Sequence, residues 1–194
     1  MGSEPIVGIL LAAGSSTRFG GFKLMHPIDG VPMCEKSAMA MKSALGAALV
    51  AVRPGSPCVP TLSGRAGIRV LECQRASEGM GGTLADAVAA LPAAGAGYVV
   101  ALADMPFIQP DSIRAMAEAL RGGASLVAPV YRGQRGHPVG LAASYRAELL
   151  ALTGDSGARA ILKRDEALIT LIEVDDPGVV RDIDTPADLI SPTA

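Results

Sequence analysis

Residues 6–23 read IVGILLAAGSSTRFGGFK, so an unbroken aliphatic run leads directly into a loop rich in glycine and serine. An apolar run of this length, with no polar residue on either face, is typical of a parallel strand buried on both sides. It is too short to cross a bilayer, and the acidic Glu4 precedes it where a signal peptide would carry basic residues. We therefore expect a buried strand over residues 6–13 that ends in the loop.

The rest of the chain repeats this alternation of aliphatic runs and helical stretches. Thr185 and Asp188 have the spacing of a capping box with Pro186 between them, so a last helix should begin just after Asp184. The stretch 52–67 is rich in Pro, Gly and Ser and predicts a surface connection. The expected strands are 6–13, 48–52, 68–72, 98–103, 125–130 and 168–174, and the expected helices are 33–45, 83–91, 110–120, 145–152 and 157–163. This order predicts an α/β fold: one domain over residues 1–194, with a mostly parallel, Rossmann-like sheet and helices on both faces. Residues 1–4 are expected to be a disordered or vector-derived start.

Composition narrows the class of protein. Apolar residues make up 49% of the chain but aromatics only 3%, so the core must be built from aliphatic side chains. A net charge of −2 without a Lys/Arg run argues against nucleic-acid binding, and no segment suits a membrane, so we expect a cytoplasmic protein. The three cysteines lack C-x-x-C spacing, which argues against a zinc site or a disulfide framework.

The loop after the first strand has the composition of a phosphate-binding loop. Ligands of open α/β sheets bind at the carboxyl ends of strands, and Gly14, Gly20 and Gly21 let the backbone approach an anion closely. Arg18 and Lys23 add positive charge. The spacing matches neither the Walker P-loop nor G-x-G-x-x-G. From these residues alone, a plain strand-to-helix connection explains the loop equally well.

LLAAGSSTRFG, followed by Lys23, resembles the signature L-A-A-G-x-S-x-R-x-G-x-x-K of the nucleotidyltransferase superfamily. Within it, the stretch is most similar to the molybdenum cofactor cytidylyltransferase branch of MobA-like enzymes. The resemblance implies a nucleotide-diphospho-sugar transferase-like fold, with Arg18 and Lys23 as catalytic residues on the triphosphate. It also implies that the nucleotide is bound by Leu11, Ala12, Ala13, Gly14, Ser15, Ser16, Arg18 and Lys23.

Asp104 ends the strand 98–103 at the same edge of the sheet as the glycine loop. Carboxylate oxygens there suit the Mg²⁺ that nucleotidyl transfer requires, although an Asp at a strand end, taken alone, is more often a helix cap or a turn. The segment resembles the family's G-D-M-P, with Ala103 replacing the Gly. The resemblance makes Asp104 a catalytic metal ligand for Mg²⁺.

DIDTPADL at residues 182–189 resembles the D-I-D-T-P-x-D-L ending of the cytidylyltransferase branch, in which Asp184 is the second metal ligand. The guanylyltransferase branch usually carries Asn in place of these Asp residues. It also tends to have a second Gly where this chain has Ala13. Both differences favour CTP over GTP.

Three further segments resemble family motifs. EGMGGTL at 78–84 is similar to the segment around the nucleobase, which implies nucleotide contacts for Gly79 and Thr83. RGQRGHPV at 132–139 implies that His137 shapes the acceptor pocket, whereas a lone His is by itself more often structural. GDSGAR at 154–159 implies acceptor binding by Asp155 and Arg159, and a capped helix with an Asp155–Arg159 pair explains it equally well.

These motifs predict a Mg²⁺-dependent cytidylyltransferase that joins CTP to molybdopterin and serves molybdoenzymes of the xanthine dehydrogenase type. Another donor (GTP) or another acceptor (a sugar, polyol or phospholactate phosphate) would leave fold and loop unchanged. A rival of another class is a non-catalytic nucleotide-binding chaperone for the cofactor. The presence of Lys23, Asp104 and Asp184 argues against that rival.

Overall fold

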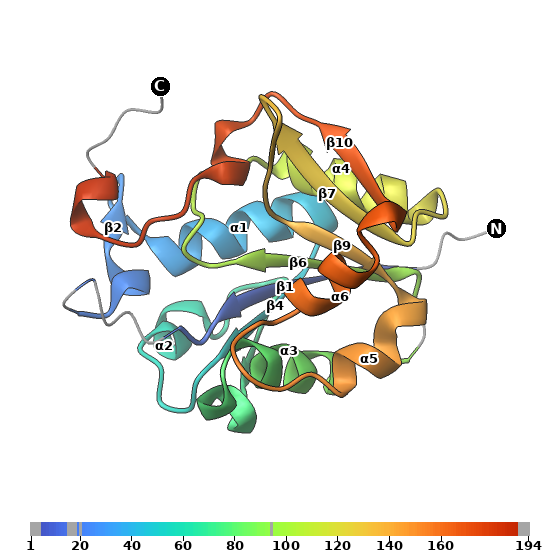
Figure 1. Ribbon diagram of the computed structural model, residues 1–194. Helices are drawn as coiled ribbons and strands as arrows, with labels where there is room; N and C mark the ends of the chain where they lie inside the picture. Colours follow the sequence, from blue (N-terminus) through green and yellow to red (C-terminus); the bar gives the residue numbers. More distant parts are fainter. Residues whose placement is uncertain (1–4, 15–18, 20, 94, 190–194) are drawn as a thin grey trace.

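The computed structural model describes residues 5–14, 19, 21–93 and 95–189, and within them lies an eight-stranded sheet (Figure 1). Its order is β10-β7-β9-β6-β1-β4-β5, with β8 paired to β7. The strands are β1 (Ile6–Ala12), β4 (Ala48–Val52), β5 (Ile68–Glu72), β6 (Gly97–Leu102), β7 (Leu126–Tyr131), β8 (Gln134–Arg135), β9 (Val139–Ala142) and β10 (Ile169–Glu173). All six predicted strands are confirmed to within one residue at each end, and the pairs β1–β4, β1–β6, β4–β5 and β7–β10 are parallel.

The strand β9 was not predicted. It lies between β6 and β7 and is antiparallel to both. Its four residues contain Gly140 and follow Pro138, so the local sequence carries little strand signal. A Cβ on Gly140 would lie 3.1 Å from the side chain of Leu120, so this glycine lets a helix pack closely on the sheet. The strand is therefore fixed by its two neighbours rather than by its own sequence.

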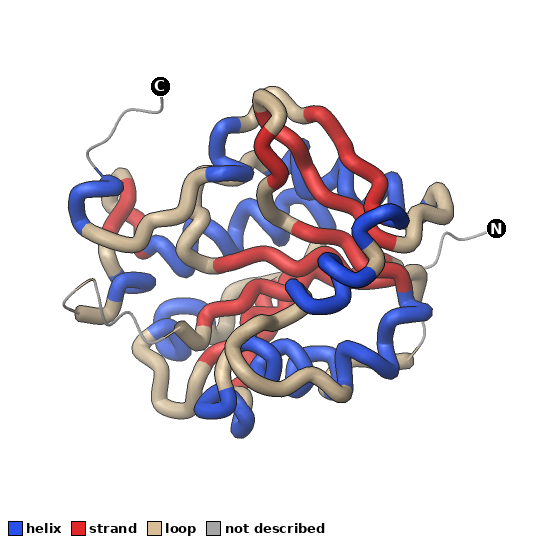
Figure 2. The backbone as a smooth tube through the Cα atoms, viewed as in Figure 1, coloured by secondary structure: helices blue, strands red, loops and turns tan. Residues whose placement is uncertain are grey.

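Helices cover both faces of the sheet, as predicted (Figure 2). One face carries α1 (Met33–Leu45), α2 (Cys58–Leu62) and α4 (Pro110–Arg121), and the other carries α3 (Met80–Ala89), α5 (Arg146–Leu150) and α6 (Arg159–Arg164). Successive residues of β1 feed the two cores, because side chains alternate across a strand. Leu10 packs in the core with α1 and α4, whereas Ile9 packs in the core with α3 and α5.

Several helix predictions needed correction. The stretch 52–67, expected to be a surface connection, contains α2, in which Cys58 and Leu62 are buried. Helix α3 begins at Met80, one turn before the predicted start, and α6 begins two residues late. The predicted helix 145–152 is a 3₁₀ turn (Ala143–Tyr145) that runs into α5. These shifts lie at helix ends, where local sequence is least decisive.

The segment after Asp184 forms a 3₁₀ helix (Pro186–Leu189) in place of the expected α-helix. The capping interaction is present nevertheless: the backbone N–H of Thr185 donates to the carboxylate of Asp188 at 2.6 Å. A small hairpin of β2 (Pro27–Ile28) and β3 (Val31–Pro32) precedes α1. Within the described ranges, no helix is long and apolar enough to cross a membrane.

Candidate active site

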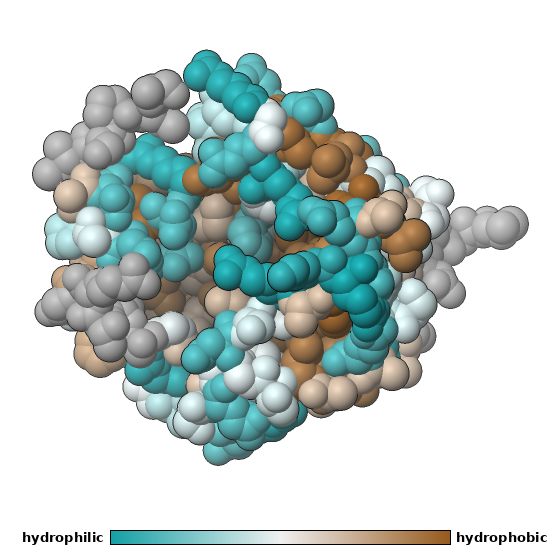
Figure 3. Space-filling view, viewed as in Figure 1, coloured by the Kyte–Doolittle hydropathy of each residue, from teal (hydrophilic) through white to brown (hydrophobic). Residues whose placement is uncertain are grey.

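Three strand ends meet at one edge of the sheet and border a cleft. Strands β4, β1 and β6 are adjacent and parallel, so the residues that follow them, Arg53, Gly14 and Asp104, lie at the same edge. The cleft has a volume of about 850 Å³, and Figure 3 shows this face of the molecule hollowed, with hydrophilic side chains around it. It is lined by Leu11, Ala12, Ala13, Gly14, Lys23, Leu24, Arg53, Pro54, Gln74, Ala76, Ser77, Gly79, Met80, Thr83, Leu102, Asp104, Asp155 and Asp184.

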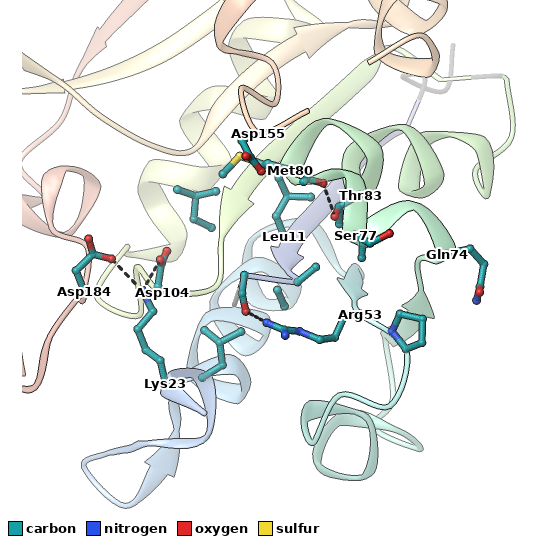
Figure 4. Close-up of a pocket in the computed structure, with 18 residues that line it drawn as sticks. Leu11, Lys23, Arg53, Gln74, Ser77, Met80, Thr83, Asp104, Asp155 and Asp184 are labelled. Atoms are coloured by element: carbon teal, nitrogen blue, oxygen red, sulfur yellow. Dashed lines mark hydrogen bonds and ion pairs between the residues drawn. The ribbon is translucent and has the colours of Figure 1, made fainter. Parts of the chain in front are cut away.

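At one end of the cleft, Lys23 joins two carboxylates (Figure 4). Its ammonium donates to Oδ2 of Asp104 at 2.9 Å and to Oδ1 of Asp184 at 3.1 Å. The Lys23 side chain is only 10% exposed, against 25% for Asp104 and 38% for Asp184. Burial by itself lowers the pKa of Lys23, but the two carboxylates outweigh it and hold the pKa above 10.5. Lys23 is therefore a cation held firmly between two anions.

Backbone contacts bring the two carboxylates together. Asp104 follows β6, and its carbonyl accepts the N–H of Ile183 at 2.9 Å. Ile183 is fully buried in the core on the α1 face. The chain on either side of Ile183 is thereby fixed against the end of β6, and Asp184 reaches the cleft from the far end of the sequence.

This pair of carboxylates fits a divalent cation. Since one nitrogen lies 2.9 and 3.1 Å from the two oxygens, these oxygens are at most about 6 Å apart, which is comparable with the ~4 Å between opposite ligands of one Mg²⁺ ion. The second oxygen of Asp104, Oδ1, is buried and has no hydrogen-bond partner among the described residues. No cluster of three or more candidate ligands occurs in the described part of the chain. Mg²⁺ suits such a site, because it commonly takes one or two carboxylates and completes its shell with phosphate and water.

The opposite wall is a close contact between the start of α3 and the loop 153–155. Gly79 has φ +103°, and a Cβ there would lie 2.1 Å from Oδ1 of Asp155 and 2.8 Å from the backbone of Gly154. The N–H of Gly81 donates to the carbonyl of Gly154 at 2.7 Å. The Thr83 hydroxyl donates to the Gly79 carbonyl at 3.0 Å, so it secures the first turn of α3. Glycines are needed here because two backbones touch.

The structure brings most of the predicted site residues to one cleft. Ser15, Ser16 and Arg18 lie outside the described residues. The residues that line the cleft as the sequence suggested are Leu11, Ala12, Ala13, Gly14, Lys23, Gly79, Thr83, Asp104, Asp155 and Asp184. His137 and Arg159 are absent from the described lining.

His137 lies beside the cleft, between β8 and β9. Its backbone N–H donates to the Val179 carbonyl at 2.7 Å, and its Nδ1 is buried without a hydrogen-bond partner among the described residues. Burial lowers its pKa from 6.5. The capped-helix explanation for Asp155 and Arg159 is not supported, because the residue before α6 is Ala158, which makes no side-chain cap. Asp155 is turned to the cleft wall instead.

Arg53 was not predicted as a site residue. It follows β4, and its guanidinium donates to the carbonyl of Gly14 (Figure 4). The rule that placed Gly14 and Asp104 at the cleft, that ligands meet the carboxyl ends of parallel strands, applies equally to Arg53. The sequence signal for Arg53 is weak because the stretch 52–67, rich in Pro, Gly and Ser, predicts a surface connection.

The model of the MobA-like NTP transferase domain matches residues 8–168 of this chain. The purine catabolism protein PucB of Bacillus subtilis (strain 168) is 31% identical over 198 residues, which cover 96% of this chain and 95% of PucB. The chain belongs to the MobA-like NTP transferase family. Its sequence motifs, quoted above, predicted this membership.

Solved structures agree with the family in fold. Rv0371c of Mycobacterium tuberculosis H37Rv superposes with a TM-score of 0.85 at 23% identity, covering 97% of this chain and 96% of that one. A structure of Rv0371c in complex with manganese gives 0.77 at 21% identity, covering 95% of each chain. The molybdopterin-guanine dinucleotide biosynthesis protein A of Archaeoglobus fulgidus gives 0.67 at 20%, covering 94% of each. The architecture is that of the nucleotide-diphospho-sugar transferases, and the MobA-like family makes the chain a nucleotidyltransferase.

Proposed function

We propose that this MobA-like nucleotidyltransferase is a Mg²⁺-dependent CTP:molybdopterin cytidylyltransferase that forms molybdopterin cytosine dinucleotide. The observation that carries the proposal is the pair Asp104 and Asp184, held by one cation at the end of a cleft that begins at the glycine loop. A carboxylate pair beside a cleft that Gly14 and Gly79 help to line suits the transfer of a phosphate-bearing group. The choice of CTP rests on the D-I-D-T-P ending and on Ala13.

The reaction needs alignment more than proton transfer. A terminal phosphate oxygen of molybdopterin attacks the α-phosphorus of CTP, and the bond from that phosphorus to the oxygen bridging to the β-phosphate breaks. Pyrophosphate leaves with the electron pair. The attacking phosphate is already an anion at neutral pH, so no general base is required. The protein must bring two anions together and offset their repulsion.

The predicted site residues and Arg53 have proposed roles in this reaction. Asp104 and Asp184 would hold Mg²⁺, which neutralises charge on the phosphate oxygens. Arg18 and Lys23 would bind the triphosphate, and Arg53 adds a cation on the other side of Gly14. The residues Gly79 to Thr83 would border the base. On the acceptor side we assign Asp155, His137 and Arg159.

Two fold neighbours agree with this proposal. The manganese complex of Rv0371c shows a divalent cation with a protein of the same fold. The A. fulgidus protein is named for molybdopterin-guanine dinucleotide biosynthesis, which agrees with a pterin acceptor and makes GTP the chief rival donor. Downstream partners would be molybdoenzymes of the xanthine dehydrogenase type.

The test is a pyrophosphate-release assay with each of the four nucleoside triphosphates and molybdopterin, with Mg²⁺ and with EDTA. We expect kcat/KM for CTP to exceed that for GTP by at least about tenfold, which asks the base pocket for only ~1.4 kcal/mol of discrimination. Competition at equal concentrations, with the dinucleotides separated by mass, gives the same ratio directly.

Three other outcomes would redirect the assignment. A mainly guanine product would replace CTP by GTP and leave the metal site unchanged. Turnover only with a sugar, polyol or phospholactate phosphate would replace the acceptor. Tight Mg²⁺-dependent nucleotide binding without turnover on any acceptor would favour the non-catalytic chaperone.

A further inference from the structure

The ammonium of Lys23 lies between the two carboxylates that are proposed to hold the metal. It contacts Oδ2 of Asp104 and Oδ1 of Asp184 at hydrogen-bond distance, and the whole residue is only 8% exposed. One positive charge therefore already offsets part of the negative charge of the pair. A divalent cation on the same two oxygens would have to replace these hydrogen bonds.

Displacement of Lys23 by a bare metal ion is unfavourable. The ammonium would lose both anionic partners while staying in a largely buried position, and a nearby dication would repel it. A nucleoside triphosphate changes this balance, because its phosphate oxygens offer the ammonium new anionic partners in the same cleft. Lys23 begins a short 3₁₀ helix (Lys23–Met25) that follows the glycine loop. Its side chain therefore starts next to the loop and ends at the two carboxylates.

We propose that Lys23 is a placeholder for the metal: it keeps bare divalent cations from the Asp104–Asp184 pair and moves onto the triphosphate when nucleotide arrives. Metal and nucleotide then bind cooperatively, and each raises the affinity of the other by the same factor. The nucleotide half of this inference rests on the proposed function. The metal half concerns only residues of this chain.

The first test measures Mn²⁺ binding without nucleotide, by the electron paramagnetic resonance signal of free Mn²⁺. Wild type is compared with Lys23→Met, which keeps the length of the side chain and removes its charge. Lys36→Met is the matched control, because Lys36 pairs with Asp29 at 2.6 Å and does not line the cleft. We expect Lys23→Met to bind Mn²⁺ at least about tenfold more tightly than wild type, and Lys36→Met to match wild type. Unchanged or weaker binding by Lys23→Met would overturn the proposal.

A thermal melt distinguishes a placeholder from a purely structural lysine. Without metal, Lys23→Met removes the cation that the two carboxylates share, so its Tm should fall below that of wild type. Mn²⁺ should recover most of that loss in Lys23→Met and shift the Tm of wild type much less. A loss of Tm that Mn²⁺ does not recover would contradict the proposal. Lys23→Gln gives a second variant if Lys23→Met does not fold.

The cooperative half is tested by repeating the Mn²⁺ titration with a non-hydrolysable CTP analogue, corrected for the metal that the analogue binds in solution. The analogue should raise Mn²⁺ affinity strongly in wild type and several-fold less in Lys23→Met. Equal gains in both proteins would refute the movement of Lys23 onto the triphosphate. Absence of cytidylyl transfer would contradict the proposed function. It would not affect the comparison of Mn²⁺ binding by wild type and Lys23→Met without nucleotide.

Discussion

The two oxygens of Asp104 lie in different environments. One oxygen accepts from Lys23, and the other, Oδ1, is buried without a described hydrogen-bond partner. A buried acceptor without a partner is unfavourable unless a donor or a cation completes it. This environment favours the proposed metal site over a turn or a helix cap, the common role of an Asp at a strand end.

We predict that Asp104→Asn folds but loses nearly all turnover, because the amide keeps the shape of the side chain and removes the charge that holds the metal. Initial rates and thermal melts measure the two effects. Asp175→Asn, at an exposed position outside the cleft lining, is the control and should keep its rate. An Asp104→Asn rate above about a tenth of wild type, a barrier change under ~1.4 kcal/mol, would exclude Asp104 from the metal site.

His137 predicts a pH dependence of stability. Burial lowers its pKa below the ordinary value of 6.5, opposed by Asp104 and Asp182 and reinforced by Arg159 and Arg135. The unfolded chain takes up the proton at a higher pH than the folded protein does. The contribution of the neutral imidazole is therefore complete above pH 6.5 and is lost as the pH falls.

His137→Asn should accordingly lose less free energy of unfolding than wild type between about pH 6.5 and 5. Urea unfolding at a series of pH values measures this slope, with His26→Asn as the control, since His26 is the other of the two histidines of the chain. If the free energy of unfolding of wild type and of His137→Asn changed in parallel with pH, burial would not lower the pKa of His137.

At the scale of elements, the cleft depends on one close contact, between the start of α3 and the loop 153–155. Gly79 and Gly123 both have positive φ, at +103° and +97°. A Cβ at Gly79 would lie 2.8 Å from the backbone of Gly154, whereas a Cβ at Gly123 would meet nothing within 4 Å. An alanine would therefore have an unfavourable backbone conformation at either position, but only at position 79 would its Cβ also contact another part of the backbone.

We predict that Gly123→Ala lowers the free energy of unfolding by only ~1–2 kcal/mol, the cost of a left-handed backbone for a residue with a Cβ. Gly79→Ala should lower it by more and should also raise the KM for CTP. The added methyl group must push the loop 153–155 away from α3 and widen the nucleotide wall. Urea unfolding and initial rates separate the two effects. Equal stability losses and equal KM values would mean that the contact does not shape the cleft.

For the molecule as a whole, the C-terminal segment closes the site that the N-terminal loop begins. Ile183 is fully buried and donates its N–H to the Asp104 carbonyl at 2.9 Å. Its side chain belongs to the core on the α1 face, whereas the buried Ile161 belongs to the core on the opposite face. The same substitution, Ile to Ala, can therefore be made in each core to test whether Ile183 holds Asp184 at the cleft.

We predict that Ile183→Ala and Ile161→Ala each reduce the free energy of unfolding by ~2–5 kcal/mol, the usual range for a buried Ile cut to Ala. Only Ile183→Ala should also weaken the binding of the Mn²⁺ complex of the CTP analogue, because Asp184 loses its anchor. Calorimetric titration of both variants measures this. Similar binding losses in the two variants would place the anchor elsewhere.

The sequence by itself determined six of the eight strands in the described sheet and the α/β class, because an aliphatic run buried on both faces carries its signal within a few residues. It also marked Lys23, Asp104 and Asp184 through motifs whose similarity to a known family is local. It did not mark β9 or α2, whose short and weakly patterned sequences are held in place by their neighbours. It did not mark Arg53, which follows a predicted strand but lies outside the motifs quoted above.

Only the tertiary structure placed one ammonium between two carboxylates. Lys23 is separated from Asp104 by 81 positions and from Asp184 by 161, so no local pattern can encode their contact. The contact arises because parallel strands end at one edge and because Ile183 is buried against the end of β6. Local sequence motifs thus identify the residues, and the packing of distant segments determines the distances between their charges.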